Sequence, residues 1–289
     1  MNINQALKNS YLKLKSSSKT YKLDCEILLS DILKIKNRFD LFLNLDKELT
    51  KNEISKFYKK ISDRQKFKPI SKIVRKKDFW KFEIDLPKNV LIPRPETETL
   101  LDLVFKVYKN KKNIQFLDVG CGSGCISLSL LDIILNSTGE AFDISKDAVL
   151  NTKLNLKKYN KHHRVKVFQK DLFKFRTNKK YDLIISNPPY LKSSDYINLC
   201  PSIKNYEPKN AYISDNKDGI SFYNHIILSL KNNIKLNGYL AFEIGDNQFI
   251  KIQNLLRKNG FIIVSKIKLI NDQIRCLLAK KIKNYALQQ

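Results

Sequence analysis

The sequence predicts an α/β protein in which a small helical bundle precedes a seven-stranded, mostly parallel sheet. A strand, a glycine-rich turn and a helix follow one another in residues 114–135. A second apolar strand stops at Asn187, directly before two prolines that cannot continue a ladder. Two strand-like segments near the C-terminus, 261–268 and 274–280, have no helix between them. We therefore expect them to pair as an antiparallel hairpin at the end of the sheet.

Length and composition limit the possible functions. The chain has 289 residues, enough for two domains, and 43% of them are hydrophobic, which supports a full core. The formal net charge of +26 suggests an anionic partner. The basic residues, however, are mostly lysines spread along the whole chain, whereas arginine is favoured for bidentate phosphate contacts. We therefore do not expect nucleic acid as the substrate.

Cysteine and histidine usage points to a reduced compartment without metal chemistry. The five cysteines are odd in number and scattered, which is typical of cytoplasmic proteins rather than of a disulfide framework. With three histidines and no Cys-x-x-Cys pair, we expect no metal site. No apolar run reaches the ~18 residues of a membrane span. We expect a cytoplasmic protein, monomeric and without membrane contact.

Residues 1–75 are predicted to form the helical bundle. Within 24–36, apolar side chains recur on one helical face, namely those of Ile27, Leu28, Ile32 and Ile35. Thr50 and Glu53 have the spacing of a capping box that opens a second amphipathic helix. Because this region contains no recognisable chemistry, its role is either structural or the recognition of a partner.

Residues 76–90 alternate in strand fashion and predict a β-hairpin linker, so that the catalytic domain comprises 91–289. A helix is expected to start at Pro95, with Glu96 and Glu98 in its first turn complementing the helix dipole. Two nearby glutamates are also found in glycosidases, but nothing else in the chain favours sugar chemistry.

The glycine-rich turn carries a strong independent signal. It consists of Gly120, Cys121, Gly122, Ser123 and Gly124, between a buried strand and an apolar helix. Glycines let a ligand lie against the backbone, and the helix N-terminus offers unpaired N–H groups to it. The pattern therefore predicts a cofactor loop.

Asp143 ends the next strand, about 20 residues further on, where a carboxylate holds the ribose hydroxyls of a nucleoside cofactor. A dinucleotide site usually has the spacing G-x-G-x-x-G, whereas this loop has G-x-G-x-G preceded by Asp118. The spacing favours S-adenosylmethionine.

The α/β alternation continues through a helix at 145–160, a strand at 164–169 that leads to Asp171, a helix at 217–236 and a strand at 239–244. The segment from 191 to 215 has few apolar residues, and we interpret it as a lid that orders on substrate binding.

The stretch around Asn187 predicts a catalytic edge. The apolar run 183–185 is suited to a buried parallel strand, and Pro188 and Pro189 hold the chain extended where open α/β sheets bind their ligands. An amide or exocyclic amine is a poor nucleophile. The Asn187 side-chain oxygen and the Pro188 carbonyl could hold its two N–H groups, with Tyr190 packing on its flat face, so catalysis would occur by positioning.

These motifs together resemble the glutamine N5-methyltransferases that modify peptide chain release factors, the PrmC/HemK family. The resemblance rests on Ile92 to Glu98, Asp118 to Gly124, Asn187 to Tyr190, Tyr206 to Pro208 with Ala211, and Phe242 to Gly245. It implies a Rossmann-like class I S-adenosylmethionine-dependent methyltransferase domain. The implied reaction is methyl transfer to the glutamine of a Gly-Gly-Gln motif in class 1 release factors, supporting translation termination.

The resemblance also assigns roles to individual residues. The glycine loop would line the methionine part of the cofactor, Asp143 the ribose, and Asp171 with Leu172 the adenine. Asn187 would border the cofactor as well and, together with Pro188, hold the substrate amide. The chain departs from the family at Cys121, Cys125 and Leu172, which bears on cofactor affinity. It also lacks the paired glycines often found before the hairpin, in 64–73.

Two other functions stay open from the sequence. An Asn-Pro-Pro-Tyr clamp also suits an N6-adenine or N2-guanine nucleic-acid methyltransferase, which would flip its base out of the stack. The chain nevertheless lacks a separate base-recognition domain after the catalytic strand. A non-catalytic basic adaptor with a nucleotide-binding fold is the second alternative. It conflicts with an intact loop, ribose acid and clamp in one chain.

Overall fold

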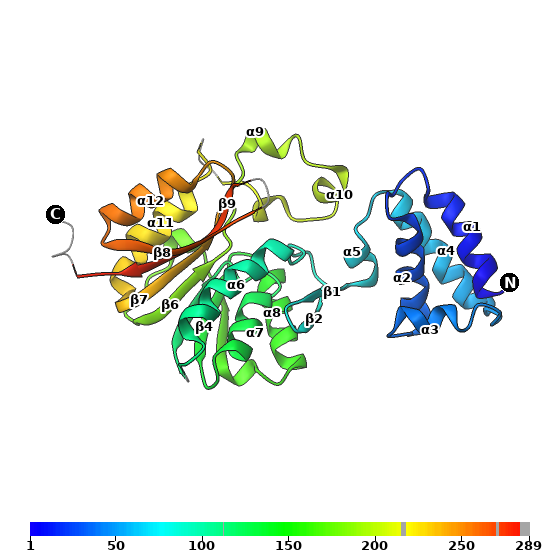
Figure 1. Ribbon diagram of the computed structural model, residues 1–289, viewed down its shortest axis with the longest axis horizontal. Helices are drawn as coiled ribbons and strands as arrows, with labels where there is room; N and C mark the ends of the chain where they lie inside the picture. The colour runs from blue at the N-terminus through cyan, green and yellow to red at the C-terminus, as the bar shows by residue number, and fades with distance from the viewer. Residues whose placement is uncertain (112, 215–217, 270–271, 284–289) are drawn as a thin grey trace. The chain divides into compact units, whose positions relative to one another are not determined.

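The computed structural model describes residues 1–111, 113–214, 218–269 and 272–283 (Figure 1). Within it the chain divides into two compact units. The first comprises residues 1–76 together with 200–206, and the second comprises 77–199 and 207–289. Each unit has its own hydrophobic core.

The first unit is helical. Its five helices are α1 (Ile3–Leu14), α2 (Tyr21–Leu33), α3 (Arg38–Phe42), α4 (Lys51–Gln65) and α5 (Ile70–Val74), and the short α10 (Pro201–Lys204) belongs to the same unit. The predicted capping box is confirmed: the Thr50 hydroxyl accepts a hydrogen bond from the Glu53 N–H, and the Glu53 carboxylate accepts one from the Thr50 N–H.

The second predicted helix is shifted from its expected bounds of 24–36. α2 begins three residues earlier and ends at Leu33, because Lys34 adopts the left-handed conformation that terminates a helix. Ile35 therefore lies outside the helix, and Leu28 is the one member of the predicted apolar face that is fully buried.

The second unit contains the predicted hairpin and a seven-stranded sheet. The hairpin strands are β1 (Lys76–Phe79) and β2 (Phe82–Asp85). The sheet has the order β5-β4-β3-β6-β7-β9-β8; β9 pairs antiparallel with β7 and β8, and the other adjacent strands are parallel. Its strands are β3 (Gln115–Val119), β4 (Thr138–Asp143), β5 (Val165–Gln169), β6 (Tyr181–Ser186), β7 (Ile234–Glu243), β8 (Phe261–Lys268) and β9 (Ile274–Lys281). The C-terminal antiparallel hairpin is thus confirmed.

Helices cover both faces of this sheet (Figure 1). One face packs against α6 (Pro95–Tyr108), α7 (Cys125–Ile133) and α8 (Lys146–Lys158), and the other against α11 (Ser221–Leu230) and α12 (Phe249–Lys258). Shorter elements complete the unit: α9 (Ser193–Tyr196), η1 (His162–Arg164), η2 (Leu172–Lys174), η3 (Lys209–Ala211) and η4 (Lys231–Asn233).

The helix predicted for 217–236 is wrong at its C-terminal end. α11 ends at Leu230, and β7 begins at Ile234, whose backbone pairs with Tyr181 of β6. Pairing with a strand far away in the sequence overrides the local helical pattern here. The first residues of the predicted helix fall partly outside the described residues.

The strand order locates the ligand site. From β3 the chain proceeds outward through β4 and β5, and then returns to β6 on the other side of β3. The carboxyl ends of β3 and β6 therefore flank the topological switch point, where open α/β sheets bind ligands. Val119 and Ser186 are partners in the parallel register, and the Ser186 hydroxyl donates a 2.7 Å hydrogen bond to the Val119 carbonyl. This pairing places the glycine loop and Asn187 side by side.

The helices of the described residues are too short or not apolar enough to cross a membrane.

Candidate active site

A cavity of about 690 Å³ lies at the carboxyl ends of the central strands. It brings together eight of the residues predicted from the sequence: Gly120, Gly122, Asp143, Asp171, Leu172, Asn187, Pro188 and Pro189. The other predicted residues, Cys121, Ser123, Gly124 and Tyr190, are not among those that line it. The glycine loop and the Asn-Pro-Pro segment thus share one cavity, although more than 60 residues separate them.

The glycine loop has the conformation that a cofactor cradle needs. Gly120 and Gly122 have φ angles of +76° and +54°, a region that other residues rarely adopt. A Cβ atom added at either residue would meet no atom within 4 Å. The loop therefore presents bare backbone to the open cavity, which fits a ligand that lies directly against it.

The Asp143 carboxylate lies at the end of β4, across from this loop. Its Oδ2 atom accepts a 3.0 Å hydrogen bond from the Gly122 N–H, and its Oδ1 atom accepts one of 2.9 Å from the Ser145 N–H. Burial raises the pKa of Asp143, while these backbone donors favour the ionised form. A carboxylate has about four acceptor positions, so two are left for the hydroxyls of a ribose.

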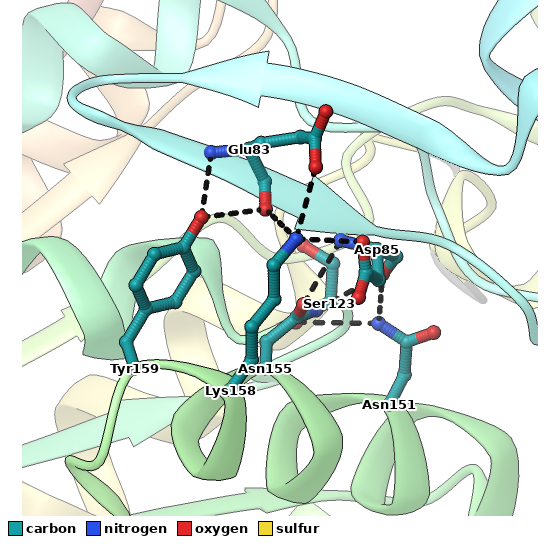
Figure 2. Close-up of polar contacts among 7 residues, drawn as sticks. All are labelled: Glu83, Asp85, Ser123, Asn151, Asn155, Lys158 and Tyr159. Carbon is teal, nitrogen blue, oxygen red and sulfur yellow. Dashed lines mark hydrogen bonds and ion pairs between the residues drawn. The ribbon is translucent and has the colours of Figure 1, made fainter. Parts of the chain in front are cut away.

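Helix α8 supports the glycine loop from behind (Figure 2). The side-chain N–H groups of Asn155 donate to the carbonyls of Ser123 and Asp85, at 2.9 and 3.0 Å. Asn151 contacts the same two carbonyls, and both asparagines are fully buried. Lys158 pairs with the carboxylates of Glu83 and Asp85. The hairpin strand β2 and the loop are therefore fastened to the same helix.

One wall of the cavity contains Asp171, Leu172 and Phe173. The Asp171 carboxylate accepts a 2.9 Å hydrogen bond from the Phe173 N–H, which holds the short η2 helix in place. Phe173 is 38% exposed, and its ring meets the ring of Phe222, another cavity residue, edge on at 5.4 Å. Although an aliphatic side chain stands at Leu172, two aromatic rings are therefore present at this wall.

The side chain of Asn187 is held by a chain of polar groups. Its Nδ2 atom donates a 3.1 Å hydrogen bond to the Thr97 hydroxyl oxygen, and that hydroxyl donates a 2.6 Å bond to Oε2 of Glu243. Thr97 lies in the first turn of α6 and Glu243 at the end of β7, and both are almost completely buried. Burial raises the pKa of Glu243, whereas hydrogen bonding from Thr97 and the charge of Arg275 lower it.

Tyr190 is fixed by the same region. Its hydroxyl lies 3.3 Å from Oε1 of Glu243, and its carbonyl accepts a 2.8 Å hydrogen bond from Gln248. The Arg275 guanidinium lies over its ring, 5.8 Å from the centroid. Burial raises the pKa of the Tyr190 phenol. These contacts hold the segment after the two prolines rigidly against β7 and β9.

An ion pair anchors the loop that returns to the cavity. The Arg94 guanidinium donates to Oε1 of Glu207 at 2.6 Å and to the Tyr212 hydroxyl, while Oε2 of Glu207 accepts a 2.9 Å bond from the Ile92 N–H. Beyond Glu207 the chain reaches Pro208 to Ala211, which line the cavity. The two segments 92–94 and 207–212 are therefore locked together beside the site.

The sequence pattern missed several of these residues. Thr97 and Glu243 lie within the motifs at 92–98 and 242–245, but the sequence alone assigns neither residue a role. Phe173 and Phe222 had no local signal, because only the fold brings their rings together at the cavity. Among the described residues, no group of three or more His, Cys, Asp or Glu side chains could hold a metal ion.

Comparison with known proteins adds an independent line of observation. A family model described as the PrmC N-terminal domain matches residues 5–74, and a model described as the methyltransferase small domain matches residues 97–200. The chain is 35% identical to the release factor glutamine methyltransferase of Clostridium botulinum over 269 residues, which cover 92% of this chain and 94% of the relative. It is 33% identical to that of Clostridium acetobutylicum, covering 96% and 98%.

Among solved structures, the ribosomal protein L11 methylase of Lactobacillus delbrueckii subsp. bulgaricus is similar, with a TM-score of 0.51 and 18% identity. The match covers 72% of this chain and 92% of that structure. At this identity the similarity shows a shared methyltransferase fold and nothing about the substrate.

Proposed function

The chain belongs to the release factor glutamine methyltransferase family and is an S-adenosylmethionine-dependent methyltransferase, and we propose that its acceptor is the glutamine of the Gly-Gly-Gln motif in a class 1 peptide chain release factor. The observation that carries the proposal is the position of Asn187. Asn187 lines the cavity shared with the glycine loop, next to two prolines that remove backbone N–H donors from this edge.

The residues on the loop side fit the cofactor. Gly120 and Gly122 offer open backbone to the methionine part, and Asp143 has acceptor positions left for the ribose hydroxyls. Asp171 and Leu172 would border the adenine, together with the rings of Phe173 and Phe222. When bound, S-adenosylmethionine supplies a methyl group that is already activated by the positive charge on sulfur.

Asn187 and Pro188 act on the acceptor. A primary amide nitrogen is a weak nucleophile because its lone pair is delocalised into the carbonyl. The Asn187 side-chain oxygen and the Pro188 carbonyl are acceptors for the two N–H groups of the glutamine amide. By fixing that amide they orient its nitrogen for attack, so the protein contributes alignment and electrostatic stabilisation.

A methyl-transfer assay tests the proposal. Labelled S-adenosylmethionine is incubated with the full-length protein and a purified class 1 release factor, the same factor with its Gly-Gly-Gln glutamine changed to alanine, and DNA or RNA. We expect label on the unaltered factor alone. Label on nucleic acid would assign the clamp to base methylation, and no label on any acceptor would contradict the proposed substrate.

A second variant tests the assignment of roles. Asn187→Ala is expected to lower turnover about 100- to 1000-fold while S-adenosylmethionine affinity, measured by calorimetry, changes little. Equal losses in turnover and affinity would contradict a clamp that acts on the acceptor. We further propose that the enzyme acts in the cytoplasm, because its acceptor is a translation factor. The expected monomer stays a prediction, which light scattering tests.

A further inference from the structure

We infer that Thr97 and Glu243 are positioning residues that set which end of the Asn187 side-chain amide faces the acceptor. The inference rests on the proposed function, in which the oxygen of that amide accepts a hydrogen bond from the substrate. An asparagine side chain has an N–H₂ end and a carbonyl end of almost the same shape. Only the carbonyl end can accept, so a side chain turned the wrong way would present donors to the N–H groups of the substrate.

The donor and acceptor roles in this series of hydrogen bonds are set first at Glu243. Its carboxylate accepts from Thr97 at Oε2 and from the Tyr190 hydroxyl at Oε1. Burial raises the pKa of Glu243, whereas both donors and the nearby positive charge of Arg275 lower it. With one hydroxyl directed at each of its oxygens, the carboxylate acts as the acceptor of both hydrogen bonds. The 2.6 Å distance to Thr97 is typical of a charge-assisted hydrogen bond.

The second step follows from the single proton of Thr97. A hydroxyl group has one hydrogen, and that of Thr97 is used on Glu243. The Thr97 oxygen can therefore only accept from its other neighbour, which lies 3.1 Å away in the Asn187 side chain. Asn187 must place its N–H₂ end against Thr97, and its carbonyl end is left for the cavity that the residue lines.

The surroundings make the arrangement rigid. Thr97 is 3% exposed and Glu243 1% exposed, so water does not compete for these groups. The Thr97 N–H donates a 3.0 Å bond to the Arg94 carbonyl in the first turn of α6. On the other side, the Glu243 carbonyl accepts a 2.9 Å bond from Tyr223, and β9 pairs with the strand at this residue. The hydrogen bonds from Asn187 to Thr97 and from Thr97 to Glu243 form a relay, and both Thr97 and Glu243 are thus held by regular secondary structure.

Replacing the hydroxyl tests the inference. Thr97→Val has nearly the same shape but neither donates nor accepts, whereas Thr97→Ser keeps the hydroxyl. The matched control is Thr99→Val on the same helix, because the Thr99 hydroxyl donates to the Glu96 carbonyl and does not contact Asn187. Methyl transfer to a release factor is measured in single turnover at saturating cofactor, and S-adenosylmethionine affinity by calorimetry.

We expect Thr97→Val to lower the rate about 10- to 100-fold with cofactor affinity within about twofold of the wild type. Thr97→Ser and Thr99→Val should remain within about threefold. Because Thr97 acts through Asn187, Thr97→Val should have no further effect in an Asn187→Ala background. A Thr97→Val rate close to the wild type, an equal loss in Thr97→Ser, or additive losses in the double variant would overturn the inference.

A measurement without any acceptor separates this inference from the proposed function. In the ¹⁵N spectrum the side-chain amide signal of Asn187 is assigned by its loss in Asn187→Ala. We expect its hydrogen exchange to be faster in Thr97→Val than in the wild type and Thr97→Ser, since the bond to Thr97 is lost. Unchanged exchange would contradict the relay even if the release factor is methylated. Faster exchange without methylation of the factor would leave the relay standing and refute the substrate.

Discussion

The two halves of the cavity are built in different ways. On the proposed cofactor side the cavity is lined by bare backbone, and side chains of α8 support it through backbone carbonyls: Asn155 donates to those of Ser123 and Asp85, 32 and 70 residues away. On the acceptor side Asn187 depends on Thr97, 90 residues before it, and Thr97 depends on Glu243, which is 146 residues from Thr97. The loop conformation in the first half is specified by one motif, whereas the hydrogen bonds of the second half exist only after the sheet has formed.

This difference predicts how each half fails. A change in the local half should alter the loop conformation, and with it stability and cofactor affinity together. A change in the hydrogen bonds of Thr97 and Glu243 should alter the rate, while the loss of an ion pair in this unit should lower stability according to how deeply the pair is buried. The following variants test the contrast in decreasing order of expected effect.

The largest loss of stability is expected on the acceptor side, for Arg94→Ala. The Glu207 side chain is 1% exposed, so removing Arg94 leaves a buried carboxylate without its cationic partner. We expect the free energy of unfolding to fall by about 3 kcal/mol. The control Lys251→Ala removes an exposed pair with Asp218 and should change it by less than about 0.5 kcal/mol. Urea unfolding followed by the fluorescence of Trp80, the only tryptophan, measures both. Similar losses in the two variants would refute the role of burial.

On the cofactor side, Gly124→Ala and Gly122→Ala form a matched pair. Both glycines have positive φ angles, so an alanine is strained at either position. At Gly124, however, the added Cβ would also lie 2.9 Å from the Cα of Thr152 in α8, whereas at Gly122 it would meet no atom. The free energy of unfolding of Gly124→Ala should therefore be about 2 kcal/mol lower than that of Gly122→Ala.

Cofactor affinity should separate the same two variants in another way. Because the Cβ of Gly122→Ala enters the open cavity, we expect a loss of S-adenosylmethionine affinity of about tenfold or more in a protein that remains folded at 25 °C. Calorimetry on both proteins checks this. A Gly122→Ala protein with unchanged affinity would show that the cofactor does not lie against this part of the loop.

The contrast also explains what the sequence could predict. The existence of the seven strands, the C-terminal hairpin, the start of α6 at Pro95 and the Thr50 cap depend on local patterns, and the structure confirms them. The end of the helix at 217–236 was wrong because Ile234 pairs with Tyr181, a partner that no local pattern reveals. Local signals were reliable where neighbouring residues determine the conformation.

The same reasoning applies to the site. The gathering of Gly120, Gly122 and Asp143 at one cavity could be predicted because a turn and a strand end have fixed places in this fold. Thr97 and Glu243 could not be given a role, since a relay of single hydrogen bonds depends on distances of a few tenths of an ångström between distant segments. Tyr190 shows the converse: its motif was recognised, but its hydroxyl lies toward Glu243, and Tyr190 is not among the cavity-lining residues.

The smallest effect is expected for Asp118, the residue two positions before the glycine loop: it changes the free energy of unfolding with pH. Burial raises the pKa of its carboxyl to about 7, although the Ser127 hydroxyl donates to Oδ2; Oδ1 has no partner in the described structure. Between pH 3.8, the ordinary pKa, and pH 7, the folded protein keeps a proton that the unfolded chain has released. Unfolding then releases that proton, so rising pH favours unfolding.

Asp118→Asn removes this dependence while keeping an acceptor for Ser127. Wild-type stability should lose on the order of 1 kcal/mol per pH unit from this group between pH 4 and 7, and the variant should not. Buried Asp143 and Glu243 have raised pKa values with the same sign, so the slope of the variant becomes shallower without vanishing. Urea unfolding at pH 5, 6, 7 and 8 measures it, with Asp78→Asn, at an exposed position of β1, as control. If Asp118→Asn follows the wild-type slope, as the control should, the carboxyl is ionised in the folded protein and the cofactor half carries a buried negative charge.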